Sequence, residues 1–323
     1  MAEVQPSVVG SLRGDRVAVS VELRPRPPFR LDLTVWALRR RAGNRIDFWD
    51  GRYRRALVVD GRPFAIEVSQ TGRATSPLLT LKVFGAGPEL TDEAVGGART
   101  VVEESLGLGV DLGGFYHLAE RDKHIAGLAA RFRGLKPPRF PTVFEALVNA
   151  VACQQLSLEV GIELLSRLSD AYGADLGGAG STLRSFPEPA ALAAASPEAL
   201  RQLGFSNRKA DTVVRLAAAA VDGDLSRMGL DALSRADAAA ALQHLGGIGR
   251  WSAEYVMLRG LGRLEVYPGD DVGARNKLRA FLGLAEAPDY RAVSEVTAPW
   301  APYAGMVYFH LLLDGLAERG LVG

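Results

Sequence analysis

The stretch LGGIGRW, residues 245–251, decides the fold of this chain. Its three glycines within four positions suit neither a helix interior nor a strand, because glycine loses more backbone freedom on ordering than any other residue. Patterns typical of helices nevertheless lie on both sides, over residues 234–245, which begin with a serine suited to capping, and over residues 251–262. The sequence therefore predicts two helices joined by a tight glycine hairpin.

The hairpin has the features of a backbone site for phosphate. Gly247 and Gly249 flank the apolar Ile248, which we expect to anchor the turn in the core, and the second helix begins at Arg250. The unpaired N–H groups of that helix and of the turn then point the same way, and such a concavity binds an anion without a side-chain charge. A glycine turn that merely joins two helices is the alternative, and the pattern alone leaves both open.

Composition limits the classes of protein that fit. The 323 residues suggest two or three domains, and the net charge of +1 means that a polyanion would be bound through local geometry. Cys153 is the single cysteine, which excludes an intramolecular disulfide and any site with four cysteine ligands. We see no apolar run of membrane-spanning length and no secretion signal in residues 1–15, so we expect a cytoplasmic protein without a membrane partner.

The pattern changes near residue 110. Before it, strand patterns surround a turn at Asp60-Gly61 and occur over residues 17–23, 55–70 and 78–84. Helical spacing occurs there over residues 29–41 and 91–106, and from residue 111 one helical pattern follows another. We therefore predict an α+β chain, with a small antiparallel sheet domain over residues 1–110 and an all-α core over residues 111–323. We expect that core to form two helical subdomains with a cleft between them.

The run LGGIGRWSAEYVMLRGLGRLEVYPGDDVGARNKL, residues 245–278, resembles the helix-hairpin-helix, Gly/Pro…Asp (HhH-GPD) superfamily of DNA glycosylases. Within that superfamily the closest resemblance is to the 3-methyladenine DNA glycosylase II (AlkA) type. It covers most of the chain from Leu112 and includes FEALVNAVACQQLS (144–157), LRQLGFSNRKADTVVRLA (200–217) and WAPYAGMVYFHLLL (300–313). The resemblance implies a mostly α-helical glycosylase core preceded by a sheet domain similar to the TATA-binding-protein (TBP) fold.

The resemblance places the catalytic aspartate at Asp271, the second acid of the loop at residues 268–271. Breaking an N-glycosidic bond develops positive charge on the sugar, and a carboxylate beside it stabilises that charge or helps a water molecule to attack. Asp271 also precedes a helical pattern, whose first N–H groups stabilise an ionised carboxylate. A simple helix cap is the alternative, but the hairpin upstream favours the catalytic interpretation.

The residue after Arg250 decides which chemistry the resemblance implies. Superfamily members that also cut the strand carry a lysine there, which forms a Schiff base with the sugar. Here it is Trp251, which implies a monofunctional enzyme that leaves an abasic site. Cationic alkylated bases stack on aromatic faces, and we predict a pocket of Trp251, Tyr255 and Trp300, with core packing as the alternative for each. Further aromatic residues, on which no prediction rests, are Phe144, Trp36 and Tyr308.

A nucleotide that is flipped out of the duplex leaves a gap, which the enzyme must fill. The segment at residues 154–157 matches the wedge loop of the family, with Gln155 at the position of the wedge and Leu156 beside it. A polar helix end is the alternative. The resemblance further implies that hairpin carbonyls hold Na⁺ or K⁺ against a DNA phosphate, and those carbonyls belong to Gln243, Leu245 and Ile248.

These features predict a monomeric, nucleoid-associated enzyme of base excision repair. It would remove alkylated purines of the 3-methyladenine and 7-methylguanine type from double-stranded DNA. No catalytic metal is expected, since the four histidines share no ligand spacing, and no cofactor is required. Two alternatives remain: the same scaffold acting on oxidised or deaminated bases, and a non-catalytic DNA-binding protein, which would not need Asp271. For the sheet domain we expect a structural role or packing away from DNA.

Overall fold

An antiparallel sheet forms the N-terminal part of the chain, as the strand patterns predict. The computed structural model describes residues 7–8, 16–86, 90–176 and 183–322, so most of the stretch 1–15 lies outside the described residues. The described strands pair in the order β1-β2-β6-β5-β4-β3. Their bounds are β1 Ser7–Val8, β2 Arg16–Leu23, β3 Phe48–Trp49, β4 Tyr53–Val59, β5 Arg62–Thr71 and β6 Leu78–Ala86. Asp60 and Gly61 turn between β4 and β5 with φ of 50° and 72°, as a tight hairpin requires.

Helices make up most of the remainder, and α1 (Leu31–Arg39) and α2 (Asp92–Ser105) accompany the sheet. Those that follow are α3 Gly113–Arg121, α4 Ala126–Arg131, α5 Val143–Cys153, α6 Leu158–Tyr172, α7 Pro189–Ala193, α8 Pro197–Gln202, α9 Asn207–Val221, α10 Arg227–Asp231, α11 Arg235–His244, α12 Arg250–Val256, α13 Val272–Leu282, α14 Tyr290–Thr297 and α15 Ala304–Ala317. A π-helical turn, Met257–Leu261, continues α12. Side-chain caps explain many of the starts, as when Ser234 accepts a hydrogen bond from the Asp237 N–H at α11. Of the described helices, none has the length and apolar character needed to span a membrane.

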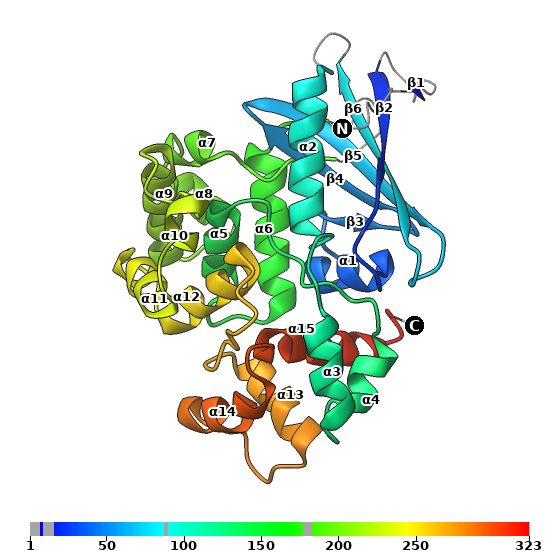
Figure 1. The fold of residues 1–323 in the computed structure, drawn as a ribbon. Coiled ribbons are helices and arrows are strands. Elements are labelled where there is room, and N and C mark those ends of the chain that lie inside the picture. Colours follow the sequence, from blue (N-terminus) through cyan, green and yellow to red (C-terminus); the bar gives the residue numbers. More distant parts are fainter. Residues whose placement is uncertain (1–6, 9–15, 87–89, 177–182, 323) are drawn as a thin grey trace.

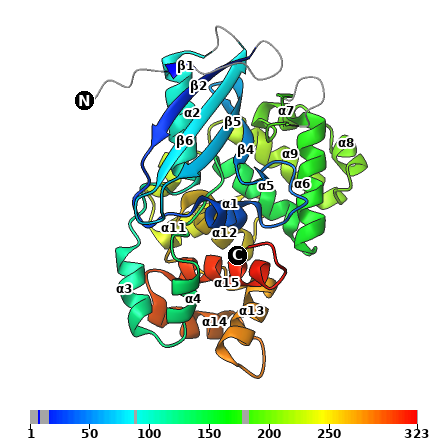
Figure 2. The same ribbon diagram turned by 90° about the vertical axis from the view of Figure 1, so that its right-hand side faces the viewer.

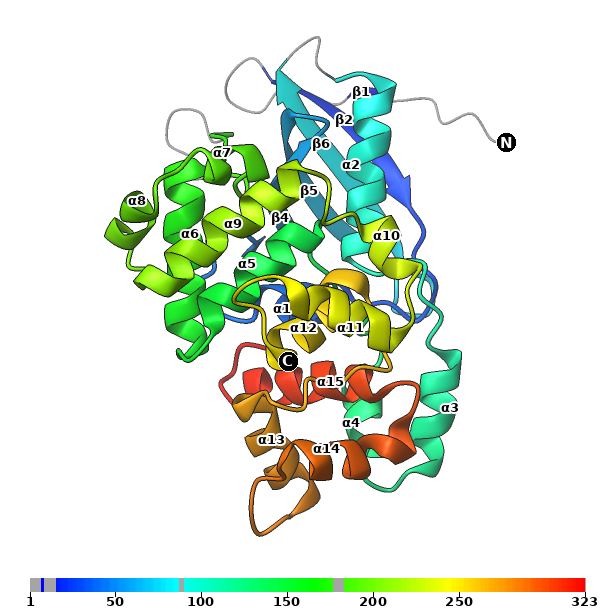
Figure 3. The ribbon, with the colours of Figure 1, turned by 90° about the vertical axis from the view of Figure 1, so that its left-hand side faces the viewer.

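Three groups of elements divide the molecule. The sheet lies at one end with α2 packed across it (Figures 1 and 2). Helices α5–α12 form a second group beside the sheet, and α13–α15 lie with α3 and α4 at the other end (Figures 1 and 3). The hairpin between α11 and α12 therefore faces the third group, where α13 and α15 lie.

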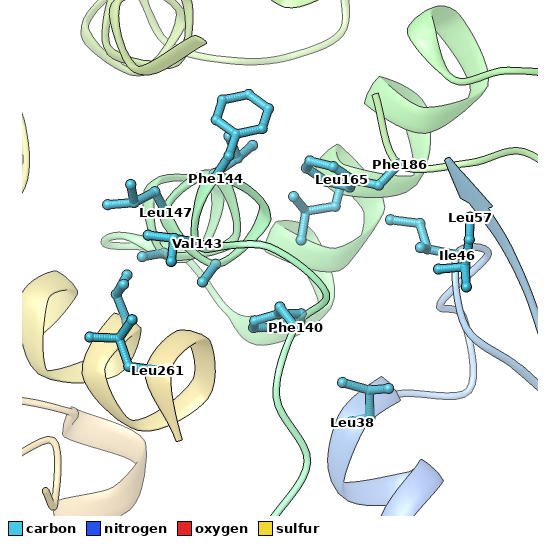
Figure 4. Close-up of a cluster of buried hydrophobic side chains, with 14 of the residues drawn as sticks. Leu38, Ile46, Leu57, Phe140, Val143, Phe144, Leu147, Leu165, Phe186 and Leu261 are labelled. Atoms are coloured by element: carbon cyan, nitrogen blue, oxygen red, sulfur yellow. The ribbon is translucent and has the colours of Figure 1, made fainter. Parts of the chain in front are cut away.

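The buried apolar side chains do not separate at residue 110. One cluster joins the sheet and α1 to α5, α6, α9 and α12, and Figure 4 shows part of it, with Leu38 and Leu57 near Phe140 and Leu165. A second cluster joins α3, α4, α13 and α15, and α1 contributes Leu33 to it. The boundary at residue 110 is therefore a change of secondary structure within a shared core.

A buried ion network also fixes the sheet to the helices. Arg55 of β4 donates to Asp47 at 2.8 Å and to Glu145 of α5 at 2.6 Å, and each of the three side chains is at most 4% exposed. The Tyr53 hydroxyl donates to the same Asp47 carboxylate at 2.9 Å. Such a network is costly to break, because removal of one partner leaves a buried charge uncompensated. It holds the segment that follows α1 against α5.

Candidate active site

A cavity of about 920 Å³ opens between the second and third groups of helices. Its walls come from the end of α1, the loop after α5, the start of α9, the hairpin with α12, the start of α13, and α15. The predicted site residues that line it are Gln155, Leu156, Gly247, Gly249, Arg250, Trp251, Tyr255 and Asp271. The fold thus brings the predicted wedge, hairpin, aromatic pair and acid to one place.

Asp271 is the N-cap of α13 and faces this cavity. Its Oδ1 accepts a hydrogen bond from the Ala274 N–H at 2.9 Å, and its Oδ2 accepts one from the Tyr308 hydroxyl at 3.1 Å. Burial raises the pKa of Tyr308 well above its usual value, and the Asp271 charge acts in the same direction, so the phenol keeps the proton that it donates. Both carboxylate oxygens of Asp271 are therefore held in a fixed orientation. The residue caps α13 and lines the cavity at the same time.

The loop that precedes α13 is fixed to α12. Glu254 accepts hydrogen bonds from the Gly269 N–H at 2.9 Å and from the Tyr290 hydroxyl at 2.7 Å. A Cβ on Gly269 would lie 2.8 Å from the Tyr290 ring, so a larger residue there would displace this ring. Arg250 pairs with Asp270 at 2.6 Å and stacks on the same tyrosine, 3.6 Å from the ring centroid. The acid loop and the hairpin helix thus form one unit.

Two of the three predicted aromatic residues form a wall of the cavity. The rings of Trp251 and Tyr255 lie 5.5 Å apart between centroids, inclined at 32°. Tyr308, on which no prediction rested, lines the cavity as well, whereas Phe144 and Trp36 are not among its lining residues. At this distance the two rings pack on each other, so a flat base would stack on the open face of Trp251 and not between the rings.

The prediction for Trp300 is wrong. This residue is 2% exposed and does not line the cavity. Its Nε1 donates to Asp122 at the end of α3 at 3.0 Å, and its ring lies 6.4 Å from that of Phe281. The ring belongs to the apolar cluster of the third group because the short 3₁₀ turn before α15 directs it there. The alternative of core packing therefore holds for Trp300.

The hairpin is a close-packed turn. Gly247 has φ of 93°, and a Cβ there would lie 2.5 Å from the Thr212 Oγ1 of α9. Ile248 is 5% exposed and anchors the turn in the core, as the sequence predicts. Gln154 donates to the Gly247 carbonyl at 3.0 Å and to Ser252 at 2.9 Å, which joins the loop after α5 to the hairpin.

The loop after α5 presents Gln155 and Leu156 to the cavity. Gln155 has φ of 53°, a left-handed conformation that is uncommon outside glycine and is often found at functional positions. Leu156 is 43% exposed, which is unusual for so large an apolar side chain next to a cavity. The geometry suits either residue as a wedge.

The sheet domain reaches the cavity, which differs from the structural role that we expected for it. Arg40 and Arg41, at the end of α1, both line it. Arg40 is 4% exposed and donates to the Tyr255 hydroxyl at 2.7 Å and to the Asn149 Oδ1 at 2.6 Å. A run of three arginines, residues 39–41, was the sequence signal, but such runs usually lie on solvated surfaces.

Two lysines line the cavity, and backbone carbonyls hold both ammonium groups. Lys209 donates to the carbonyls of Ala152 and Gln154 at 3.0 and 2.7 Å. Lys277 donates to the carbonyl of Leu311 at 3.0 Å, and burial lowers its pKa. Neither amine points freely at a substrate.

The carbonyls predicted to hold a monovalent cation lie at the hairpin, where that of Leu245 accepts a hydrogen bond from the Ile248 N–H at 3.0 Å. A carbonyl has a second lone pair, so this bond is compatible with a cation. Among the described residues, no three His, Cys, Asp or Glu side chains gather as metal ligands would.

Known proteins share this sequence pattern and this fold. Residues 148–302 match the model of the HhH-GPD superfamily base excision DNA repair proteins. DNA-3-methyladenine glycosylase 2 of Escherichia coli (strain K12) is 34% identical over 55% of this chain and 60% of its own length, so the chain spans less than two thirds of that relative. A 3-methyladenine DNA-glycosylase from Archaeoglobus fulgidus superposes with a TM-score of 0.80 and 25% identity, over 93% of this chain and 98% of that one.

A second solved structure contains DNA. The Schizosaccharomyces pombe 3-methyladenine DNA glycosylase Mag1, in complex with abasic DNA, has a TM-score of 0.53 and 27% identity over 61% of this chain and 94% of that one. The hairpin and the fold agree with these similarities. Over residues 148–302 the chain is similar to the HhH-GPD superfamily of base excision DNA repair proteins, and the proteins that resemble it in sequence and fold include DNA glycosylases named for 3-methyladenine.

Proposed function

We propose that this protein is a monofunctional DNA glycosylase, which hydrolyses the N-glycosidic bond of a damaged nucleotide and leaves an abasic site. The observation that carries the proposal is the Asp271 carboxylate, oriented by Ala274 and Tyr308 at the edge of a cavity large enough for a base. As the bond breaks, positive charge develops on the sugar and the carboxylate stabilises it, while a water molecule adds to C1′.

Water is the nucleophile in this proposal because none of the described residues that line the cavity offers a free amine to replace it. Position 251 holds tryptophan, and the ammonium groups of Lys209 and Lys277 are occupied by backbone carbonyls. A Schiff base needs a free, deprotonated amine beside C1′. We therefore expect no strand cleavage by the enzyme itself.

The substrates that we propose are alkylated purines of the 3-methyladenine and 7-methylguanine type. The Trp251 ring, which packs on Tyr255 at the cavity, offers a face on which a flat base can stack. The printed names of the related glycosylases, which refer to 3-methyladenine, support the same class.

The partner that we propose is double-stranded DNA containing a damaged base, bound by a monomeric protein. The hairpin N–H groups at Gly249 and Arg250 would hold a phosphate, with Na⁺ or K⁺ on the carbonyls of the same turn. Gln155 and Leu156 would fill the space of the flipped nucleotide. The rim of the cavity supports this arrangement, because Arg41, Arg208 and Arg319 line it and can pair with the DNA backbone.

The test uses duplex DNA treated with a methylating agent. We expect the wild-type protein to release methylpurines, detected by chromatography, and to create sites that break only after alkali. Asp271→Asn should lower release about a hundredfold or more while keeping its binding to a duplex with an abasic-site analogue. Asp289→Asn is the matched control, because Asp289 caps α14 with the same geometry, accepting from the Ala292 N–H at 2.8 Å. Equal release by wild type and Asp271→Asn would refute the catalytic assignment.

A further inference from the structure

The wedge loop, residues 154–157, connects α5 to α6 and presents two side chains to the cavity. Gln154 is the C-cap of α5 and Ser157 is the N-cap of α6, so only two residues of the loop have no capping role. These two, Gln155 and Leu156, are exposed, and the first has φ of 53°. A backbone in this conformation persists only where its surroundings fix it, so the contacts around the loop decide what it can do.

The carboxamide of Gln154 joins the wedge loop to both halves of the hairpin. Its Nε2 donates to the Gly247 carbonyl in the turn at 3.0 Å, and to the Ser252 hydroxyl in the first turn of α12 at 2.9 Å. Ser252 is 2% exposed, so this second bond is shielded from water. The N–H groups proposed to hold a phosphate belong to Gly249 and Arg250, which lie between these two points in the chain. Gln154 therefore spans the phosphate site of the hairpin.

Helix α9 supports both the loop and the hairpin, and it packs along α5 (Figure 3). The Lys209 ammonium donates to the carbonyls of Ala152 and Gln154 at the end of α5, at 3.0 and 2.7 Å. A cation is favourable there, because the last carbonyls of a helix have no partner within it. Three residues later, on the same face of α9, Thr212 packs against the hairpin, since a Cβ on Gly247 would lie 2.5 Å from its Oγ1. One helix face thus holds the wedge loop and the hairpin in place.

We propose that Gln154 is a positioning residue for base flipping, because it fixes the wedge relative to the phosphate site of the hairpin. The inference rests on the glycosylase function proposed above and deepens it. A phosphate held by the hairpin sets where the duplex lies against the protein. The connection through Gln154 then sets how far Gln155 and Leu156 enter the duplex, and Lys209 supports the same loop from α9.

The free-energy cost of base flipping explains why this connection matters. A nucleotide that leaves the duplex loses its pairing and stacking, and the loss is smallest for a base that is already unpaired. A wedge loop that could bend away would meet the base stack without displacing it, so binding at the phosphates would not force the target base out. A loop fixed to the hairpin cannot bend in this way. Loss of the Gln154 contacts should therefore slow the release of a paired lesion more than the release of an unpaired one.

Single-turnover base release from two duplexes tests the proposal. One duplex contains 7-methylguanine paired with cytosine, and the other contains 7-methylguanine opposite an abasic-site analogue. Gln154→Leu keeps a side chain of similar size but removes both donated hydrogen bonds. For this variant we expect the ratio of the paired rate to the unpaired rate to fall about five- to fiftyfold. Lys209→Met removes the support from α9 and should lower the same ratio.

Gln70→Leu is the matched control, because this glutamine also makes two hydrogen bonds to the backbone of a distant segment. The Gln70 carboxamide accepts from the Leu31 N–H at 2.7 Å and donates to the Phe29 carbonyl at 3.1 Å. It is not among the described residues that line the cavity. The substitution therefore removes a similar set of hydrogen bonds away from the wedge loop, and it should leave the ratio of the two rates unchanged.

The ratio separates base flipping from stability, because loss of folded protein lowers both rates equally. An unchanged ratio in Gln154→Leu would overturn the proposal, and so would an equal fall in Gln70→Leu. If Gln154→Leu does not fold, the ratio in Lys209→Met decides alone. Failure of the proposed function looks different, because the wild-type protein would then release 7-methylguanine from neither duplex, or Asp271→Asn would release it at the wild-type rate.

Discussion

Replacement of Gly247 by alanine tests whether the hairpin is as rigid as its packing indicates. The new Cβ would lie 2.5 Å from Thr212 Oγ1 and 2.8 Å from Thr212 Cγ2, and the residue would have to keep φ of 93°. The left-handed backbone costs alanine about 1–2 kcal/mol, and overpacking of this kind costs about 1–3 kcal/mol. We therefore expect Gly247→Ala to lower the free energy of unfolding by about 2–5 kcal/mol. That is a large share of the roughly 5–15 kcal/mol that stabilises a typical protein.

The assay is urea unfolding together with binding to an abasic duplex, and two further variants separate the contributions. Gly249→Ala is the control, because a Cβ there meets nothing within 4 Å and φ is −93°. Thr212→Ala removes both clashing atoms, so combining it with Gly247→Ala should recover the overpacking part and leave the backbone part. If Gly247→Ala unfolds at the same urea concentration as Gly249→Ala, the hairpin yields to the extra atom and our account of its rigidity is refuted.

Two further predictions concern the acid and the core. Tyr308→Phe removes the donor to Asp271 and should slow base release about ten- to a hundredfold with little change in stability, whereas an unchanged rate would show that this hydroxyl does not orient the acid. Burial lowers the pKa of His310 to about 4, so between pH 6.5 and 4 the unfolded chain binds a proton that the folded chain does not. The free energy of unfolding should therefore fall by about 3 kcal/mol as the pH drops through this interval. In urea unfolding, His310→Gln should lose less stability than the wild-type protein over the same interval. An equal loss in both proteins would contradict this assignment.

Local chemistry explains why so much of the fold could be predicted. The strands alternate in the sequence, Asp60-Gly61 adopts the positive φ values that its composition favours, and Ser234 caps the helix that it precedes. The glycine hairpin could be located because Gly247 satisfies a backbone requirement that few other residues meet. Such features depend on neighbours in the chain, so the sequence carries them directly.

The direction of a single side chain depends instead on distant segments. Trp251 lies in the first turn of α12 and Trp300 ends the 3₁₀ turn Ala298–Trp300, yet the first lines the cavity and the second donates a hydrogen bond to Asp122 away from it. That outcome depends on how α15 meets α3 and α4, which no local pattern encodes. The contact of Tyr308 with Asp271 could not be predicted for the same reason, since it joins α15 to α13.

The sheet domain shows how far this dependence extends. Its strands share one apolar cluster with α5, α9 and α12, and the Arg55 network ties β4 to α5. These contacts fix the end of α1, and hence Arg40, beside the ring of Tyr255. A domain with no motif of its own therefore contributes a charge to the cavity, and it can do so because its core is continuous with that of the helices. A shortened protein that begins at residue 111 would lose this charge along with the sheet, so the sheet belongs to the active site as well as to the scaffold.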